Sequence, residues 1–160
     1  MIIENPTILV VDDDDCATLL VSTVFERAGL VRPLQFARDG EEAIAYLSGE
    51  GAYADRTRFP FPTVMLLDLN MPRKNGFDVL AWLREQPVLK RLPVYVLSAS
   101  SRSEDIRRCY NLGANLYLVK PGNLEGMMHQ ARCLLAWLKL SHVAPVETSV
   151  SCSQDLKIWA

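Results

Sequence analysis

The sequence predicts an α/β fold in which a doubly wound, five-stranded parallel sheet, with strand order 2-1-3-4-5, is covered by helices on both faces. Short β-branched runs alternate with amphipathic stretches along the 160-residue chain. The strand runs are almost entirely apolar, which is what burial on both faces of a parallel sheet requires. Glycine and proline mark the boundaries between the two kinds of segment.

The first strand and the first helix have the clearest patterns. Thr7–Val11 is a nearly continuous apolar run, typical of a central parallel strand. A helix is expected from about Asp14 to Ala28, because apolar residues recur there at helical spacing and Gly29 supplies a C-terminal cap. The inward-facing residues of this helix are expected to be Ala17, Leu20, Val24 and Ala28.

The middle of the chain supplies two further strand–helix units, divided by a loop. Leu34–Ala37 is a weak second strand, and Gly40–Ser48 has the pattern of a second helix. Residues 49–62 contain glycines and prolines without a hydrophobic period, which predicts a loop. Thr63–Asp68 is the expected third strand, and a third helix over Phe77–Glu85 ends shortly before a proline.

The last two units complete the alternation. Pro93–Ser98 is the expected fourth strand, since the missing N–H of proline is tolerated at a strand's first residue. Ser101 and Glu104 form a capping-box pattern at the start of a fourth helix, which a glycine ends. Leu116–Val119 is the fifth strand, and a long last helix runs from Leu124 to about Leu140.

Length and composition limit the classes of protein to consider. We expect one domain over residues 1–142 and a flexible, polar tail over 143–160. A net charge of −2 gives no basic surface, so binding to nucleic acid is not expected. No apolar run is long enough to span a membrane, and the N-terminus lacks the features of a signal peptide. These absences favour a cytoplasmic protein.

The cysteines give no support for a zinc site or a disulfide framework, because they are scattered and form no CxxC pair. The four are Cys16, Cys109, Cys133 and Cys152. Cys109 and Cys133 fall on apolar helix faces and are expected to be small core residues.

Polar side chains stand at the carboxyl ends of the expected strands. Asp12 and Asp13 follow the first strand, Asp68 ends the third, Ser98 the fourth, and Lys120 follows the fifth. In an open parallel sheet these ends line one crevice where ligands bind. Three carboxylates held together need a compensating cation, and such hard oxygen ligands suit Mg²⁺. An aspartate beside Mg²⁺, with a lysine to neutralise phosphate oxygens, can act as a nucleophile on phosphorus.

Each of these residues also has an ordinary structural explanation. An aspartate pair after a strand is often only the N-cap of the next helix, and we expect Asp14 and Asp15 to have that role. A single aspartate, serine or lysine at a strand end carries little information. The functional prediction depends on all of them falling at strand ends in one alternating pattern.

At these positions the sequence resembles the receiver domains of two-component response regulators. The matching segments are ILVVDD at 8–13, LLDLNMPRKNGFDVL at 66–80, VLSAS at 96–100 and GANLYLVKP at 113–121. The resemblance covers about residues 5–141 and implies a flavodoxin-like (βα)5 fold. The segments YLSGEGAYADRTRFPFP at 46–62 and WLREQPVLKRLPVYVLSAS at 82–100 look most like those of single-domain regulators that partner bacteriophytochrome-type histidine kinases.

The resemblance implies a role for each residue of the strand-end group. Asp68 is implied as the phosphoacceptor, with Asp12, Asp13, Asp68 and the backbone carbonyl of Asn70 around Mg²⁺. Ser98 and Lys120 are implied to contact the phosphoryl group, and Tyr117 to be the aromatic switch that turns inward when the Ser98 hydroxyl moves. Family members usually have a cis peptide before the residue that matches Pro121.

The same resemblance implies partners rather than substrates. The expected phosphoryl donor is a sensor histidine kinase, with the phytochrome type as the candidate, or a phosphotransfer protein. With no output domain expected after the receiver, signalling would proceed through a changed binding surface. The last helix carries more apolar residues than one core-facing stripe needs, which favours a homodimer, or docking of a partner protein, through the surface of helix 4, strand 5 and helix 5. The alternative is that the tail folds over this surface.

Two other functions compete with the phosphorylated switch. Asp12-x-Asp14 after a strand roughly fits the nucleophile motif of haloacid-dehalogenase-like phosphatases, but no late acidic pair or cap domain is evident. A pseudo-receiver scaffold that is never phosphorylated is the other alternative, and the complete residue set argues against it. The switch itself is expected to catalyse only its own phosphorylation and dephosphorylation.

Overall fold

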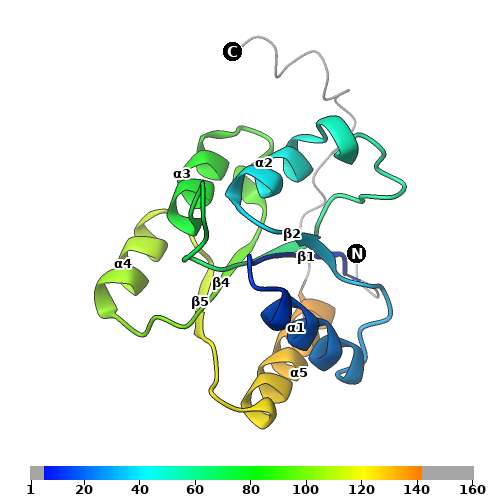
Figure 1. The fold of residues 1–160 in the computed structure, drawn as a ribbon, viewed down its shortest axis with the longest axis vertical. Helices are drawn as coiled ribbons and strands as arrows, with labels where there is room; N and C mark the ends of the chain where they lie inside the picture. Colours follow the sequence, from blue (N-terminus) through cyan, green and yellow to red (C-terminus); the bar gives the residue numbers. More distant parts are fainter. Residues whose placement is uncertain (1–5, 142–160) are drawn as a thin grey trace.

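The computed structural model describes residues 6–141, and these form a five-stranded parallel sheet flanked by helices (Figure 1). The strands are β1 (Ile8–Val11), β2 (Gln35–Ala37), β3 (Val64–Leu67), β4 (Val94–Ser98) and β5 (Leu116–Val119). They pair in the order β2-β1-β3-β4-β5, so the predicted fold class and strand order are confirmed.

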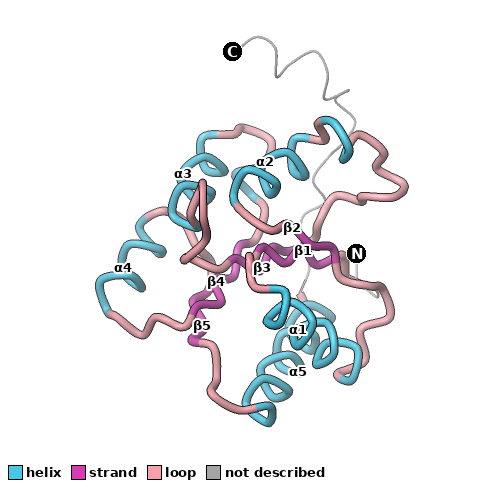
Figure 2. Tube along the Cα trace, in the orientation of Figure 1, coloured by secondary structure: helices cyan, strands magenta, loops and turns pink. Residues whose placement is uncertain are grey.

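Helices cover both faces of this sheet. They are α1 (Asp15–Arg27), α2 (Gly40–Ser48), α3 (Gly76–Glu85), α4 (Ser103–Asn111) and α5 (Leu124–Leu140). Figure 2 shows α1 and α5 on one face of the sheet and α2, α3 and α4 on the other. The predicted bounds of α2 and α5 agree with the structure. Those of α1 differ by one residue at each end, and those of α3 by one residue at the start.

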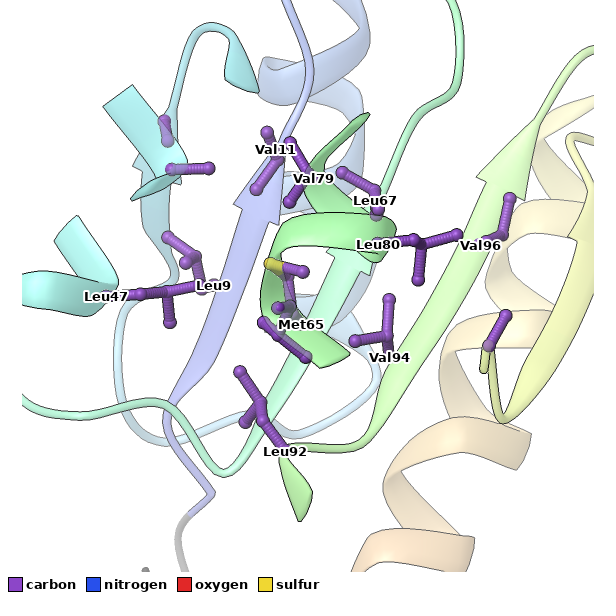
Figure 3. Packing of buried hydrophobic residues seen from close by; sticks show 14 of the residues in the cluster. Leu9, Val11, Leu47, Met65, Leu67, Val79, Leu80, Leu92, Val94 and Val96 are labelled. Carbon is purple, nitrogen blue, oxygen red and sulfur yellow. The ribbon is translucent and has the colours of Figure 1, made fainter. Parts of the chain in front are cut away.

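Alternation along the strands divides the buried apolar side chains into two clusters. In β1, Leu9 and Val11 join the cluster under α2, α3 and α4, whereas Ile8 and Val10 join the cluster under α1 and α5. Figure 3 shows the first of these clusters between the strands and the covering helices. Because both faces are filled, the strands have no room for polar side chains, and polar groups collect at their carboxyl ends.

The buried side of the first helix is rotated by about one residue from the predicted one. Its buried residues are Val21, Val24 and Phe25, whereas Leu20 is 38% exposed. The predicted N-cap is confirmed, because the Asp14 side chain accepts hydrogen bonds from the first-turn N–H groups. The aspartate run is therefore partly helix-capping and partly site-forming.

The predicted capping box at Ser101 and Glu104 is wrong. The N-cap of α4 is Arg102, which makes no side-chain cap bond. The hydroxyl of Ser100 instead donates to the Asp105 carboxylate at 2.6 Å and accepts from the Arg102 N–H at 3.3 Å. The start of α4 is thus held by the residue before the predicted cap.

The 49–62 loop packs closely against the domain and contains a short 3₁₀ helix over Gly51–Tyr53. The Arg56 guanidinium donates to the carbonyl oxygens of Tyr46 at 2.7 Å and Leu47 at 2.9 Å, at the end of α2. The Tyr46 hydroxyl donates a hydrogen bond to the Pro60 carbonyl oxygen at 2.8 Å. Hydrogen bonds therefore fasten the loop to the end of α2.

The two helical cysteines differ in burial. Cys109 is buried as predicted, and burial raises the pKa of its thiol to about 11. Cys133 is exposed, so its predicted place in the core is wrong. It lies on the outer side of α5, away from the buried residues Ala131, Leu134, Leu135 and Leu138.

The predicted tail over 143–160, with Cys152, lies outside the described residues. Within residues 6–141, none of the helices is both long enough and apolar enough to cross a bilayer.

Candidate acidic site at the carboxyl edge of the sheet

The predicted acidic residues meet because their strands are neighbours in register. Val11 of β1 is paired with Leu67 of β3, so the residue that follows each strand, Asp12 or Asp68, lies beside the other. One carboxylate oxygen from each of Asp12, Asp13 and Asp68 lies within 4.8 Å of the others. The structure thus brings together the three carboxylates that the sequence singled out.

These carboxylates differ in their access to solvent. Asp12 is 5% exposed and Asp68 is 9% exposed, whereas Asp13 is open to solvent. One oxygen of Asp12 accepts the N–H of Asp14 at 3.0 Å, and one oxygen of Asp68 accepts its neighbouring Leu69 N–H at 2.9 Å. The site is therefore a buried carboxylate pair with an accessible third member at its rim.

Lys120 bridges the two buried carboxylates. Its Nζ lies 2.7 Å from Oδ2 of Asp12 and 3.7 Å from Oδ2 of Asp68. Its backbone N–H donates to the Ser98 carbonyl at 2.8 Å, which extends the pairing between β4 and β5. The register of these two strands therefore delivers the ammonium group to the carboxylates of β1 and β3.

Burial raises the pKa of Asp68 above its ordinary value, since desolvation disfavours the charged carboxylate. The Lys120 ammonium lowers this pKa, and the neighbouring Asp12 carboxylate raises it. The net direction is upward. A cation placed against the carboxylates would favour the ionised form of Asp68.

The ligand atoms fit a hard divalent cation. Carboxylate oxygens are the ligands that Mg²⁺ and Mn²⁺ prefer, and the exposed Asp13 leaves the rim open to water. Asn70 lies in the exposed turn that follows β3, two residues beyond Asp68. Its predicted carbonyl ligand therefore belongs to the loop next to the carboxylates.

Ser98 and Tyr117 are connected through the loop after β4. Ser98 is fully buried, and its hydroxyl accepts the N–H of Ser100 at 3.2 Å. The hydroxyl of Tyr117 donates to the carbonyl of Ser100 at 2.9 Å, and its half-buried ring packs against the cluster under α2, α3 and α4. The Tyr117 ring is therefore turned inward and hydrogen-bonded to the loop that begins at Ser98.

The peptide bond before Pro121 is trans, since residues 6–141 contain no cis peptide, so the cis bond implied by the resemblance is not found. The trans form is the favoured one even before proline, by about 0.5–1 kcal/mol.

Sequence reasoning missed two supports of the site. A Cβ on Gly76 would lie 2.3 Å from the carbonyl oxygen of Asp68, so only glycine allows α3 to begin against this backbone. The buried Asp39 is ion-paired with Arg73, which lies in the same loop as Asn70. The glycine was visible within NMPRKNG, but neither contact can be read from local sequence.

With this geometry established, comparison with known proteins identifies the class. Residues 8–132 match the model of the response regulator receiver domain, so the chain belongs to this family. Members act in two-component signalling, with a histidine kinase as partner, and are typically phosphorylated on an aspartate.

Individual relatives match over most of their length. Response regulator Rcp1 of Synechocystis is 37% identical over 138 residues, which cover 84% of this chain and 92% of that protein. The phosphorylated cyanobacterial phytochrome response regulator RcpA is 34% identical with a TM-score of 0.79, over 88% of this chain and 99% of that one. The Mn²⁺-bound form of Rcp1 is 35% identical with a TM-score of 0.77, over 88% and 99%. The chain is therefore a receiver domain similar to phytochrome response regulators. Receiver domains bind a divalent metal.

Proposed function

We propose that Asp68 accepts a phosphoryl group from a histidine kinase of the phytochrome type, or from a phosphotransfer protein. The observation that supports this proposal is the meeting of Asp12, Asp13 and Asp68 with the Lys120 ammonium at one sheet edge. A carboxylate oxygen of Asp68 forms the new bond to phosphorus as the bond between phosphorus and the donor breaks.

The neighbouring side chains have distinct parts in this transfer. Lys120, already between the two buried carboxylates, moves its charge to the arriving phosphoryl oxygens. The Ser98 hydroxyl donates to one of these oxygens. Asp12, Asp13, Asp68 and the carbonyl of Asn70 would hold Mg²⁺, which would supply positive charge to neutralise the phosphoryl oxygens.

The output is a changed protein surface, without enzymatic action on other molecules. When the Ser98 hydroxyl turns to the phosphoryl group, the loop through Ser100 moves with it, and Tyr117 follows because its hydroxyl is bonded to that loop. The surface that Tyr117 borders carries exposed apolar side chains on α4, β5 and α5. These are Tyr110, Val119, Trp137 and Leu140. We propose this surface as a homodimer interface that phosphorylation strengthens.

Phosphorylation is tested with acetyl phosphate and Mg²⁺, followed by intact mass and alkali treatment. We expect one alkali-labile phosphate on the wild type, none on Asp68→Asn, and a strongly reduced rate for Lys120→Met. Equal labelling of Asp68→Asn would contradict the proposal. Labelling that requires Asp12 but not Asp68 would instead support the phosphatase alternative, and an unlabelled wild type would support a pseudo-receiver.

The interface is tested by light scattering with and without beryllofluoride, a mimic of the phosphoryl group. We expect the mimic to double the molar mass of the wild type. Asp68→Asn should keep the mass of a monomer with and without it. Val119→Lys should remain monomeric while still accepting phosphate. A wild type that is monomeric under both conditions overturns regulated dimerisation and leaves phosphorylation intact.

A further inference from the structure

The outer side of α5 carries a histidine and a cysteine one helical turn apart. Nε2 of His129 lies 3.7 Å from Sγ of Cys133, and both side chains are exposed. Positions four residues apart are neighbours on one helix face, so the helix itself holds the two groups together. Neither residue belongs to the acidic site, whose side chains come from the ends of β1, β3 and β5.

The separation of these two atoms matches that of two ligands on one tetrahedral ion. With a zinc–sulfur bond of about 2.3 Å, a zinc–nitrogen bond of about 2.0 Å and a tetrahedral angle, the two ligand atoms lie about 3.5 Å apart. The observed 3.7 Å requires no backbone movement to reach that separation. A hydrogen bond between thiol and imidazole accounts for the same distance, so experiment must distinguish the two.

We propose that His129 and Cys133 form a binding site for a borderline-soft divalent cation of the zinc class. Thiolate and imidazole select such ions, whereas the carboxylates of the acidic site select magnesium-like ions. On binding, the Cys133 thiol releases its proton to solvent and the resulting thiolate bonds to the ion, while His129 binds through its neutral ring. The chain then has two metal sites of opposite ligand preference.

The remaining coordination positions point to a second copy of this chain. Zinc in structural sites takes four protein ligands, and within residues 6–141 one copy supplies two at this place. Trp137, one turn beyond Cys133, is 64% exposed, and Leu140 is 80% exposed on the same outward side of α5. Two copies that met along these helices would cover both apolar side chains and assemble two histidines and two cysteines around one ion. The occupant of this α5 surface is therefore another copy, joined through the metal.

The test uses Co²⁺ as a spectroscopic substitute for zinc. The protein is the full chain carrying Cys16→Ser and Cys152→Ser, called the parent variant. Excess Mg²⁺ is added to keep Co²⁺ from the acidic site. These substitutions leave Cys133 and the buried Cys109 as the thiols. Coordination by Cys133 gives a near-ultraviolet thiolate-to-cobalt band, which oxygen ligands cannot give. We expect the band to saturate at one ion per two chains, together with a doubling of mass by light scattering.

Three variants make the result specific. Cys133→Ser should abolish the band, and His129→Ala should weaken cobalt binding at least tenfold. His142→Ala, at the chain's second histidine, is the matched control and should leave the titration unchanged. Circular dichroism confirms that each variant remains helical.

Each outcome decides one step of the proposal. Absence of the cobalt band in the parent variant overturns the metal site. So does persistence of the band when Cys133→Ser is added to that variant. A band that saturates at one ion per chain on a monomer supports the site and overturns the second copy. Because beryllofluoride is omitted, failure here does not bear on phosphorylation at Asp68.

Discussion

Arg73 forms an ion pair with Asp39, whose carboxylate is completely buried at the start of α2. The backbone of Arg73 is left-handed, with φ of 62°. Beside this pair the Gly40 N–H donates to the Lys74 carbonyl at 3.1 Å, and a Cβ on Gly40 would lie 2.5 Å from that oxygen. These contacts fasten the loop after Asp68 to the beginning of α2.

Removal of the guanidinium should destabilise the domain. In Arg73→Met the buried Asp39 carboxylate keeps its backbone N–H partners, from Glu41 and Glu42, but loses its cation. We expect a loss of about 1–3 kcal/mol, less than for a fully buried pair because the Arg73 side chain is 59% exposed. Urea unfolding measures this change.

A control and a rescue define the cause. Arg102→Met removes an ion pair to Glu104 in which both side chains are over two-thirds exposed, at 72% and 71%, and should cost under about 0.5 kcal/mol. Asp39→Asn combined with Arg73→Met should recover part of the loss, since no charge is left buried. Equal costs for the two arginine variants would show that burial of the Asp39 carboxylate does not strengthen its ion pair.

The site was predictable where it depends on strand ends and unpredictable where it depends on loops. Asp12, Asp68 and Lys120 meet because parallel strands end at one edge, and that follows from the alternating pattern alone. Asp39 and Arg73 are 34 residues apart. Their contact requires a left-handed residue in one loop and a helix start in another, and no local period encodes such a pairing.

Gly76 should be intolerant of any side chain. In Gly76→Ala the added Cβ would lie 2.3 Å from the Asp68 carbonyl oxygen and 2.9 Å from the Leu69 Cα, and both are backbone atoms that cannot rotate away. We expect a loss of about 1–3 kcal/mol or more, as for other overpacked sites. Thermal unfolding gives the stability, and the acetyl phosphate rate at a temperature where the variant is folded reports displacement of Asp68.

Gly122→Ala is the matched substitution, because a Cβ there meets nothing within 4 Å. It should change stability by under about 0.5 kcal/mol. If Gly76→Ala unfolds at the same temperature as Gly122→Ala, the close approach between α3 and Asp68 does not constrain the sequence.

The 49–62 loop should depend on Arg56. Its guanidinium donates to carbonyl oxygens at the end of α2, within contact of the Tyr46 and Phe61 rings. Arg56→Met should therefore cost about 1.5–3 kcal/mol, the range for hydrogen bonds to a charged group, and should speed proteolysis within the loop. Arg58→Met, which removes a contact over the Phe59 ring and an exposed attraction to Asp55, should cost about 1 kcal/mol or less. Equal protease sensitivity in the two variants would contradict the fastening role of Arg56.

Sequence periodicity located the helices well, but it misplaced the side chain of Cys133. The bounds of α5 are as predicted, because a long apolar stripe and the flanking turns define them. Cys133 was assigned to the core because apolar residues surround it in sequence, although they extend beyond the buried stripe. The same excess leaves Trp137 and Leu140 exposed. This exposed apolar surface agrees with the excess of apolar residues that the sequence predicted for the last helix.

The raised pKa of Asp68 predicts a pH-dependent gain in stability for Asp68→Asn. The folded state binds the Asp68 proton more tightly than the unfolded state does, chiefly because burial disfavours the carboxylate. The stabilising contribution of Asp68 is therefore complete below its unfolded pKa of about 3.9, and it is lost as pH rises through the raised folded pKa. Relative to wild type without divalent metal, Asp68→Asn should gain little near pH 3 and gain most at neutral pH.

Urea unfolding of both proteins across this pH range measures the difference, and Asp55→Asn provides a control of opposite sign. Hydrogen bonds from Thr57 hold the pKa of the Asp55 carboxyl below its ordinary value, so its contribution is present at neutral pH and is lost as pH falls. Mg²⁺ should then raise the stability of wild type more than that of Asp68→Asn, because the proposed site loses a ligand in the variant. A gain for Asp68→Asn that stays constant from pH 3 to neutral would mean that the substitution acts through packing and not through the buried charge.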